Sequence, residues 1–343
     1  MERIEIKLHS TEPHVSQILT GFCMLEASNK GQYNVHTSTE VEGVKGAFVE
    51  VIYRGKKIIY DVMDGYQDVN AISELLNRCD FYFKRSYSVK KNEEFGLMHT
   101  DKMYPLGFNY HVSCKNHPLD KSVWKETIKK WLRIENNTYS NTSFSAELFE
   151  EIPTYKENGF TVLFATRLWG PEKGLPEHLN VERQYINQMR INIIRSIREI
   201  DGVNFIGGVS DNSFSRAFAP DLIIPEKMTN RKSYIKILHT ADICIGTMGL
   251  HESIRWKTGE YVAASKAIVN ETFHYTVPGA FLPKKNYLEF ENEDQCIAAV
   301  KALLADPEWL FEMKKANREY YCAYLRLDRL IRNTLDIVDK VMG

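Results

Sequence analysis

The first half of the chain carries short apolar and polar alternations that predict strands and helices in mixed order. Two β-rich runs, 46–53 and 56–63, flank Arg54-Gly55, a dipeptide typical of a tight hairpin turn. The same patterns predict further elements: a strand at 4–9, a helix at about 14–27, a helix at 71–78, a strand at 79–87 and a helix at 121–135. A polar stretch at 136–142, a short helix at about 143–150 and a Pro/Gly connector at 151–159 follow, and we place a domain boundary there.

The second half is more regular, because apolar runs typical of buried strands alternate with helical periodicity. The predicted strands are 160–166, 203–208, 242–247 and 266–270, and the predicted helices are about 180–200, 231–241, 252–265 and 293–305. Such alternation favours a parallel, doubly wound sheet with helices on both faces. In such sheets, ligands bind at the carboxyl ends of the strands. From about residue 309 to 342 the pattern is almost entirely helical.

Composition and charge narrow the class of protein. A length of 343 residues favours two domains. The 44 basic and 45 acidic residues leave a net charge of −1, which gives no electrostatic case for a nucleic-acid partner. No run of about 18 apolar residues occurs, and the start MERIEIKLHS lacks an apolar centre, so neither a membrane span nor a signal peptide is expected. We therefore expect a cytoplasmic protein, with peripheral contact with the inner face of the cell membrane left open.

Two cationic residues follow the first strand of the second half. Arg167 stands at the carboxyl end of the predicted strand 160–166, and Lys173 lies six residues further on. Two cations at a strand end could neutralise a diphosphate and stabilise the charge that grows on a leaving group. The alternative is an Arg and a Lys that are merely solvated in a surface loop.

Two carboxylates define the second segment, residues 251–269. Glu252 and Glu260 lie eight positions apart, so on one helix they are about 80° apart and two turns along. A loop that contains Gly249 precedes this predicted helix, whose free N–H groups could face a phosphate. Arg255 and Lys257 add positive charge. The alternative is a solvated amphipathic helix.

These segments resemble motifs of a known family. TRLWGPEKG (166–174) resembles the GRLxxEKG element of retaining family-four glycosyltransferases (glycosyl transferases group 1), and ESIRWKTGEYVAASKAIV (252–269) resembles their EX7E element. The order and separation also fit, over most of 160–270. Lys173 lies one residue further from Arg167 than in the family pattern, and Ser253-Ile254-Arg255 replaces its Gly-rich turn. Whether the anomeric configuration is retained therefore stays open.

The resemblance implies an α/β fold of the GT-B type, with two Rossmann-like, doubly wound domains that face a central cleft. The acceptor-binding domain would span 1–152, joined by a C-terminal helix at 320–343, and the nucleotide-sugar-binding domain would span 153–319. By resemblance, Arg167 and Lys173 contact the donor diphosphate, Glu260 the ribose hydroxyls and Glu252, as a catalytic residue, the donor sugar. The remaining candidate donor-binding residues are Gly249, Arg255 and Lys257.

The acceptor is expected to bind the first domain. Asp64, after the predicted hairpin, is the candidate general base if the enzyme inverts configuration, and its alternative role is that of a plain turn residue. His9, Lys84 and Arg85 are candidate acceptor-binding residues, and Lys84 and Arg85 could hold an acidic or phosphorylated acceptor. Their alternative is a strand end in water.

These observations predict a metal-independent, hexosyltransferase-like enzyme that needs no cofactor. It would move a sugar from a nucleoside-diphosphate sugar to a hydroxyl of a glycan or lipid-linked glycan, in surface polysaccharide synthesis. Two alternatives keep the same fold: a nucleotide-sugar 2-epimerase, and a non-catalytic partner subunit of an active transferase.

Overall fold

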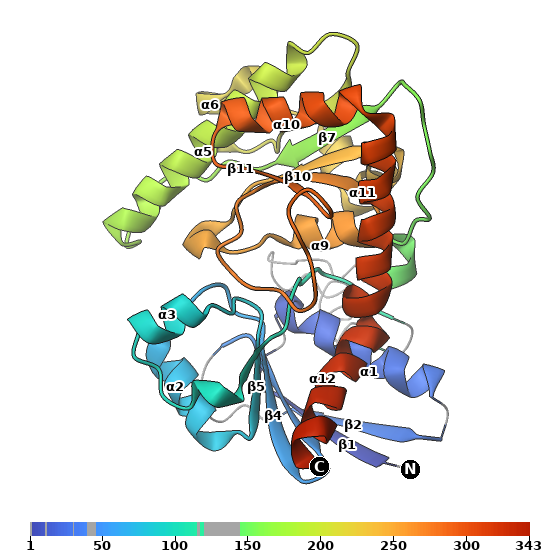
Figure 1. Ribbon diagram of the computed structural model, residues 1–343. Helices are drawn as coiled ribbons and strands as arrows, with labels where there is room; N and C mark the ends of the chain where they lie inside the picture. Colours follow the sequence, from blue (N-terminus) through green and yellow to red (C-terminus); the bar gives the residue numbers. More distant parts are fainter. Residues whose placement is uncertain (1, 11, 30, 40–45, 115–116, 120–144) are drawn as a thin grey trace, which may run out of the picture. The chain divides into compact units, whose positions relative to one another are not determined.

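The computed structural model describes residues 2–10, 12–29, 31–39, 46–114, 117–119 and 145–343, in two compact units that each have their own sheet (Figure 1). Unit 1 comprises Met1–Leu148, Thr276–Pro278 and Ala323–Gly343, and unit 2 comprises Phe149–Tyr275 and Gly279–Cys322. Both units are Rossmann-like α/β folds, as the sequence predicts. The helix expected at 121–135 and the polar stretch at 136–142 lie outside the described residues, and the domain limits drawn from the sequence stay a prediction.

Unit 1 contains a six-stranded mixed sheet in the order β2-β1-β3-β4-β5-β6. Its strands are β1 (Glu2–Leu8), β2 (Tyr33–Thr39), β3 (Phe48–Tyr53), β4 (Lys56–Asp61), β5 (Phe81–Lys84) and β6 (Met103–Pro105). Only β3 runs against its neighbours, because it forms an antiparallel hairpin with β4. Arg54 and Gly55 in its turn have φ angles of 50° and 73°, the left-handed pair that two-residue hairpin turns favour. The predicted hairpin is therefore confirmed.

The described helices of unit 1 are α1 (Ser16–Ser28), α2 (Val69–Arg78), α3 (Val89–Glu94) and α12 (Leu327–Met342), with short 3-10 turns at Pro13–Val15, Thr100–Lys102 and Ala146–Leu148. Of these helices, α1 and α12 pack along each other. A Cβ atom at Gly21 of α1 would lie 2.8 Å from the carbonyl oxygen of Leu327, so glycine permits the close approach of α12. The hydroxyls of Tyr60 on β4 and Thr334 on α12 lie 2.7 Å apart, which fastens α12 to the sheet.

Unit 2 contains a five-stranded, all-parallel sheet in the order β11-β10-β9-β7-β8. Its strands are β7 (Thr161–Thr166), β8 (Asn204–Val209), β9 (Ile243–Gly246), β10 (Ala267–Glu271) and β11 (Leu288–Phe290). Its helices are α5 (Glu177–Arg198), α6 (Ser213–Phe218), α7 (Glu226–Thr229), α8 (Arg231–Thr240), α9 (Trp256–Ala263), α10 (Glu293–Ala305) and α11 (Pro307–Tyr320). Apolar side chains of one face of the sheet form a buried core with residues of α5 and α10.

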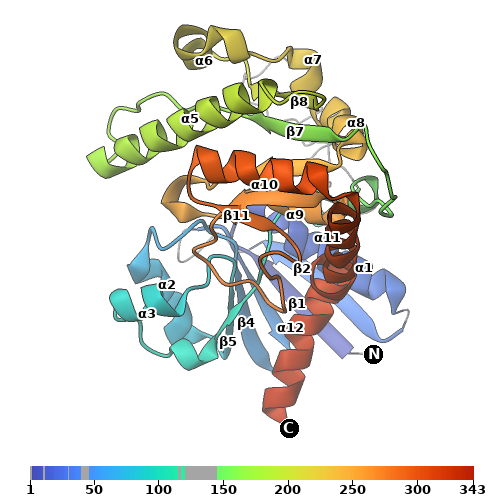
Figure 2. The ribbon, with the colours of Figure 1, turned by 45° about the horizontal axis from the view of Figure 1, so that its top comes forward.

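The helices of unit 2 cover both faces of its sheet, which is the doubly wound arrangement. Helices α5 and α10 pack side by side on one face, and α9 lies on the other (Figure 1 and Figure 2). A π-helical segment, Tyr321–Leu325, links α11 to α12 along the chain. Among the helices that the structure describes, none combines the length and the apolar character needed to cross a lipid bilayer.

Candidate functional site

The strand order of unit 2 creates a topological switch point between β7 and β9. From β7 the chain moves to β8 on one side and then returns to β9 on the other side of β7. At such a point the two connections leave the sheet in opposite directions, and ligands of doubly wound sheets bind there, at the carboxyl ends of the strands. The candidate site is therefore the edge where β7 ends at Thr166 and β9 ends at Gly246.

Three arginines surround one tryptophan at this edge. The guanidinium carbons of Arg167, Arg190 and Arg255 lie 5.3, 4.4 and 5.8 Å from the ring centroid of Trp169, and we name these four residues the arginine cluster. Within the described part of the chain, no carboxylate oxygen lies within 4.0 Å of the three guanidinium groups. Burial lowers the pKa of Arg255 to about 10, and repulsion from Arg167 adds to this effect. The cluster is thus a concentration of positive charge that no carboxylate of the described residues pairs with.

Local structure explains two of these positions. Arg167 is the first residue after β7 and its side chain is exposed, as the sequence predicts for a strand end. Arg255 precedes α9 at the N-cap position, and its Nη1 donates to Thr166 Oγ1 at 2.9 Å. This bond ties the start of α9 to the end of β7 and holds Arg255 at the strand edge. Their part in ligand binding stays a prediction.

Helix α9 contributes a buried carboxylate and a half-buried lysine. Glu260 is 1% exposed; its Oε1 accepts from Arg231 Nη1 at 2.5 Å, whereas no donor of the described residues reaches its Oε2. The ammonium of Lys257 lies 4.1 Å from the ring centroid of Tyr234. Burial lowers the pKa of Lys257 to about 7, and repulsion from Arg255 and Arg231 adds to this, while Glu260 opposes it. Lys257 is therefore only partly charged at neutral pH.

The predicted helix from 252 to 265 is wrong at its start, because α9 begins four residues after Glu252. Glu252 ends the turn η6 (Leu250–Glu252), in which His251 and Glu252 adopt left-handed φ angles of 60° and 58°. The N–H of Gly249 donates to the carbonyl oxygen of Ser253 at 2.9 Å and closes this loop. Glu252 and Glu260 thus do not share a helix, and the spacing argument for two carboxylates on one ligand does not hold.

Two further predicted residues, the catalytic candidate Glu252 and the donor-binding candidate Lys173, do not belong to the arginine cluster. Glu252 is 44% exposed at its side chain, and its Oε1 lies 3.9 Å from His274 Nδ1. Its backbone N–H donates to Glu182 Oε1 at 3.3 Å. Lys173 is exposed in the loop after β7, and no carboxylate of the described residues lies within 4.0 Å of its ammonium. Nothing in these contacts gives either residue a specific role.

In unit 1, the prediction that Lys84 binds an acceptor is wrong. Lys84 and Asp61 are both 0% exposed, and their charged groups lie 2.7 Å apart. The ammonium is enclosed by the sheet end, so it cannot meet a ligand. The side chain of His9 is also buried, stacked on Phe48 with ring centroids 4.8 Å apart, and its acceptor role stays a prediction.

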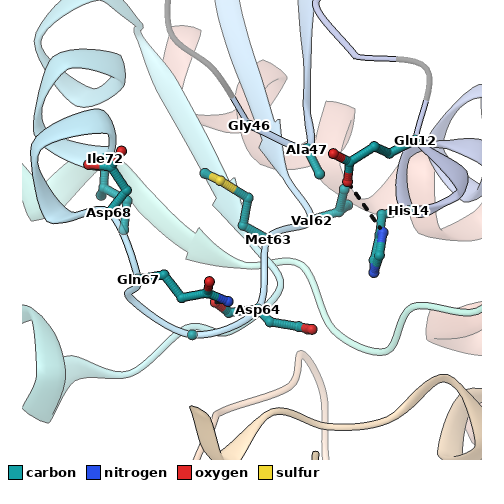
Figure 3. Close-up of a pocket in the computed structure, with 11 residues that line it drawn as sticks. Glu12, His14, Gly46, Ala47, Val62, Met63, Asp64, Gln67, Asp68 and Ile72 are labelled. Carbon is teal, nitrogen blue, oxygen red and sulfur yellow. Dashed lines mark hydrogen bonds and ion pairs between the residues drawn. The ribbon is translucent and has the colours of Figure 1, made fainter. Parts of the chain in front are cut away.

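Asp64 lines a pocket in unit 1 that Figure 3 shows, and Arg85 pairs with Asp64. The cavity measures about 270 Å³, and its polar lining residues are Glu12, His14, Asp64, Gln67 and Asp68. Arg85, which is 4% exposed, donates from Nη1 to Asp64 Oδ1 at 2.6 Å, so Arg85 anchors Asp64 instead of facing solvent. His14 Nδ1 lies 3.7 Å from Glu12 Oε2. Burial lowers the pKa of His14, and repulsion from the charge of Arg85 lowers it further, so the imidazole stays neutral near pH 7.

The sequence analysis did not single out Trp169, Arg190, Arg231 or His14. The sequence pattern of α5 could have pointed to Arg190. Residues 183, 187, 190, 194 and 197 form one stripe of α5 at helical spacing, apolar at Ile194 and Ile197 and polar at the other three positions. A buried stripe that changes from apolar to polar indicates polar partners in the interior.

Comparison with known proteins yields structural likeness only. No protein-family model and no curated protein sequence matches the chain. Among solved structures, Alr3699/HepE of Anabaena in complex with UDP-glucose is similar over 98% of this chain and 100% of its own, at 12% identity and a TM-score of 0.47. A glycosyltransferase of Rickettsia africae is similar over 98% of this chain and 84% of its own, at 15% identity and a TM-score of 0.45.

A third similar structure covers the second half alone. The C-terminal domain of a glycosyl transferase group 1 family protein (LpcC) of Francisella tularensis matches 52% of this chain and 97% of its own, at 10% identity and a TM-score of 0.38. Two of these three structures are named as glycosyltransferases. Likeness at this level carries no substrate over to this chain, whose α/β fold class follows from its own two sheets.

Proposed function

We propose that this protein is a glycosyltransferase that moves a sugar from a nucleoside-diphosphate sugar to a hydroxyl of a glycan or lipid-linked glycan. The observation that carries the proposal is the arginine cluster at the switch point of unit 2, where three guanidinium groups have no carboxylate partner among the described residues. Positive charge that the described residues do not neutralise favours an anionic ligand. A diphosphate fits that requirement, since it is doubly charged and compact.

The arrangement suits the departure of a nucleoside diphosphate. When the bond from the sugar to the diphosphate breaks, negative charge grows on the leaving oxygen. Arg167, which is exposed, can donate to that oxygen directly, and Arg255 and Lys257 raise the local potential. In this proposal the chain's cations take the place of a metal ion at the phosphates.

Glu260 is the proposed partner of the ribose. Its Oε2 is buried without a donor among the described residues, and such acceptors in native proteins usually have a partner. A ribose hydroxyl would supply one. Since Glu260 is 1% exposed and is paired with Arg231, which is 25% exposed, the ribose would have to displace the side chain of Arg231.

The pocket of unit 1 is the proposed acceptor site. Its five polar side chains offer acceptors and donors for sugar hydroxyls, and the neutral imidazole of His14 can take up a proton. Asp64, the base that the sequence suggested, already binds Arg85 through one oxygen. The proposal also includes a part in surface polysaccharide synthesis, contact of Glu252 with the donor sugar and contact of Lys173 with the donor diphosphate.

A ligand panel tests the proposal. The melting temperature would be measured with ADP, CDP, GDP and UDP, with the matching monophosphates and with the free nucleosides. We expect one diphosphate to stabilise the protein by about 2.7 kcal/mol at 100 times its Kd, or roughly 5–10 °C for a domain of this size, and its nucleoside to have no effect. A panel without any stabilising diphosphate would contradict a nucleotide-sugar site.

Reaction products then separate transfer from the alternative chemistry. The matching nucleotide sugars are incubated with and without a glycan acceptor, and products are identified by chromatography and mass spectrometry. Transfer requires the acceptor and releases the diphosphate. A changed nucleotide sugar that forms without an acceptor would instead identify an epimerase, and binding without any conversion would favour a non-catalytic subunit.

Lys257 predicts how the affinity for a nucleotide sugar depends on pH. Its lowered pKa of about 7 means that the free protein carries a mixture of charged and neutral Lys257 at neutral pH. A bound diphosphate favours the charged form, so affinity is fully developed below pH 7 and falls as pH rises through the pKa of the bound state. We expect a several-fold loss between pH 6.5 and 8.5, with proton uptake in calorimetry.

The experiment has two controls, one in the choice of ligand and one in the protein. UDP-glucose is a suitable probe because both its phosphates are esterified, so its own charge is constant over this range. The variant Lys257→Gln should bind more weakly at pH 6.5 and should show a flat profile. An equally steep profile in this variant would assign the pH dependence to another group.

A further inference from the structure

One face of α5 holds the loop that carries Arg167. Three polar residues of that face, at positions i, i+4 and i+7, bond to the backbone of the loop after β7. Arg183 Nη1 donates to Gly170 O at 3.0 Å, and Arg190 Nη1 donates to Arg167 O at 2.7 Å. Between them, Asn187 Oδ1 accepts from Trp169 N–H at 3.0 Å and Asn187 Nδ2 donates to Trp169 O at 2.7 Å. Helix and loop run in opposite directions along this contact. The backbone of residues 167–170 is thus fixed by the helix, whatever the side chain at 167.

Arg190 differs from the other two residues because it also reaches the loop after β9. Its Nε donates to Thr247 Oγ1 at 3.0 Å and its Nη2 donates to Met248 O at 3.0 Å. With its bond to Arg167 O, the one side chain therefore joins both strand ends of the switch point. The N–H of Met248 donates to Glu271 Oε2 at 2.8 Å, so the same peptide segment is held from β10 as well.

Arg190 also differs in the burial of its guanidinium and in having no ion-pair partner among the described residues. It is 0% exposed, and among the residues described here no carboxylate oxygen comes within 4.0 Å of its guanidinium. Burial lowers its pKa well below the usual value, and repulsion from Arg255 and Arg167 adds to this, while Glu271 acts in the opposite sense. Arg183 lacks this property, since its Nη2 lies 2.7 Å from Glu172 Oε2.

Keeping a buried, unpaired cation lowers stability, because its charge loses the solvation of water. The three hydrogen bonds of Arg190 to loop atoms could be made in part by neutral side chains, so they do not by themselves account for an arginine. Its charge, however, acts on anything at the strand edge through an interior of low dielectric constant. An anion there gains from Arg190 without touching it.

We infer that Arg190 is a positioning residue of the phosphate site: it holds the ends of β7 and β9 together and supplies buried positive charge to an anion bound by Arg167. This inference rests on the proposed function, since it concerns the same diphosphate. It adds a residue that the ligand does not contact. It also predicts that affinity depends on the charge at position 190 separately from the hydrogen bonds made there.

The test compares two substitutions at position 190 with one matched control. Binding of inorganic pyrophosphate and of UDP is measured by calorimetry at low salt for Arg190→Gln, Arg190→Lys and Arg183→Gln, with melting temperatures measured alongside. We expect Arg190→Gln to bind pyrophosphate about tenfold more weakly, and Arg190→Lys to fall between this variant and the wild type. Arg183→Gln, which removes an arginine already neutralised by Glu172, should stay within about threefold of the wild type.

A folded Arg190→Gln variant with wild-type affinity would overturn the inference, and so would Arg190→Lys binding as weakly as Arg190→Gln. If Arg190→Gln does not fold, Glu271→Gln decides. It keeps an acceptor for Met248 N–H but removes the carboxylate that offsets Arg190, so pyrophosphate binding should tighten several-fold; unchanged or weaker binding would refute the inference. A wild type that binds neither probe would sink the proposed function as well, whereas unaffected variants of a binding wild type sink this inference alone.

Discussion

Replacing Arg167 by alanine is expected to weaken the binding of nucleoside diphosphates about 10- to 100-fold, because a hydrogen bond to a charged group contributes about 1.5–3 kcal/mol. The protein should fold as before. The Arg167 side chain is exposed and has no carboxylate within 4.0 Å among the described residues, and the ring of Trp169 lies 5.3 Å from its guanidinium carbon. The bond from Arg190 to this position goes to the carbonyl oxygen, which alanine retains.

The measurement is calorimetric titration with the best diphosphate of the panel and with its nucleoside, at one ionic strength. Loss of affinity should be confined to the diphosphate. Arg195→Ala is the matched control, because Arg195 is an exposed arginine of the same unit, 3.1 Å from Asp221, and lies in the last turn of α5. If Arg167→Ala binds the diphosphate as the wild type does, the phosphate site lies elsewhere in the chain.

Regular elements were predictable wherever a local pattern decides the conformation. The hairpin of β3 and β4 follows from Arg54-Gly55 between two β-rich runs, and strands β7, β8, β9 and β10 of unit 2 follow from their apolar runs. Strand β2 (Tyr33–Thr39) was missed, because its sequence YNVHTST carries few apolar residues. Strand β2 lies at the edge of the sheet, and its pairing with β1 stabilises it more than burial of its side chains does.

The start of α9 shows where a local pattern fails. The residues from Glu252 onwards have helical spacing, but the bond from Gly249 N–H to Ser253 O and the left-handed angles at His251 and Glu252 keep the chain in a loop. Such a loop costs backbone strain, which tertiary contacts must offset. One such contact is the bond from Tyr275 Oη to His251 O at 2.7 Å, which joins residues 24 positions apart and is invisible to any helical pattern.

The composition of the arginine cluster could be predicted only in part. Arg167 was found because it follows a recognisable strand, and Arg255 because it belongs to a motif. Arg190 and Trp169 join them through contacts between α5, the loop after β7 and the loop after β9, which depend on the strand order of the sheet. Which strands are neighbours is a property of the whole fold, and no single segment encodes it.

Lys84 illustrates the opposite error, in which a charged residue was taken for a ligand-binding group. Its pairing partner in the sheet is Asp61, so the ends of β4 and β5 bring the two charges together. Asp61 also accepts from the hydroxyl of Tyr82 at 2.7 Å and from the N–H of Met63 at 2.8 Å. The carboxylate is thus fully satisfied, and the ion pair is an interior feature of unit 1.

Removing the lysine of this pair is expected to destabilise the protein strongly. Lys84→Met would leave the Asp61 carboxylate buried without a cation, which costs about 3–5 kcal/mol, or roughly 10 °C in melting temperature. Acidification should then restore part of the stability, since protonation of Asp61 removes the unpaired charge. Thermal and urea unfolding of the wild type and the variant at pH 7 and at pH 5 measure both effects.

A second substitution distinguishes the lost pair from lost packing. Asp61→Asn combined with Lys84→Met removes both charges and keeps an acceptor for Met63 N–H, so it should recover most of the stability that the single variant loses. Lys56→Met is the matched control: its ammonium lies 3.2 Å from Asp80, but both side chains are about 40% exposed, and the loss should stay below about 1 kcal/mol. A double variant as unstable as Lys84→Met would show that methionine fits the site poorly and that the buried charge is not the cause.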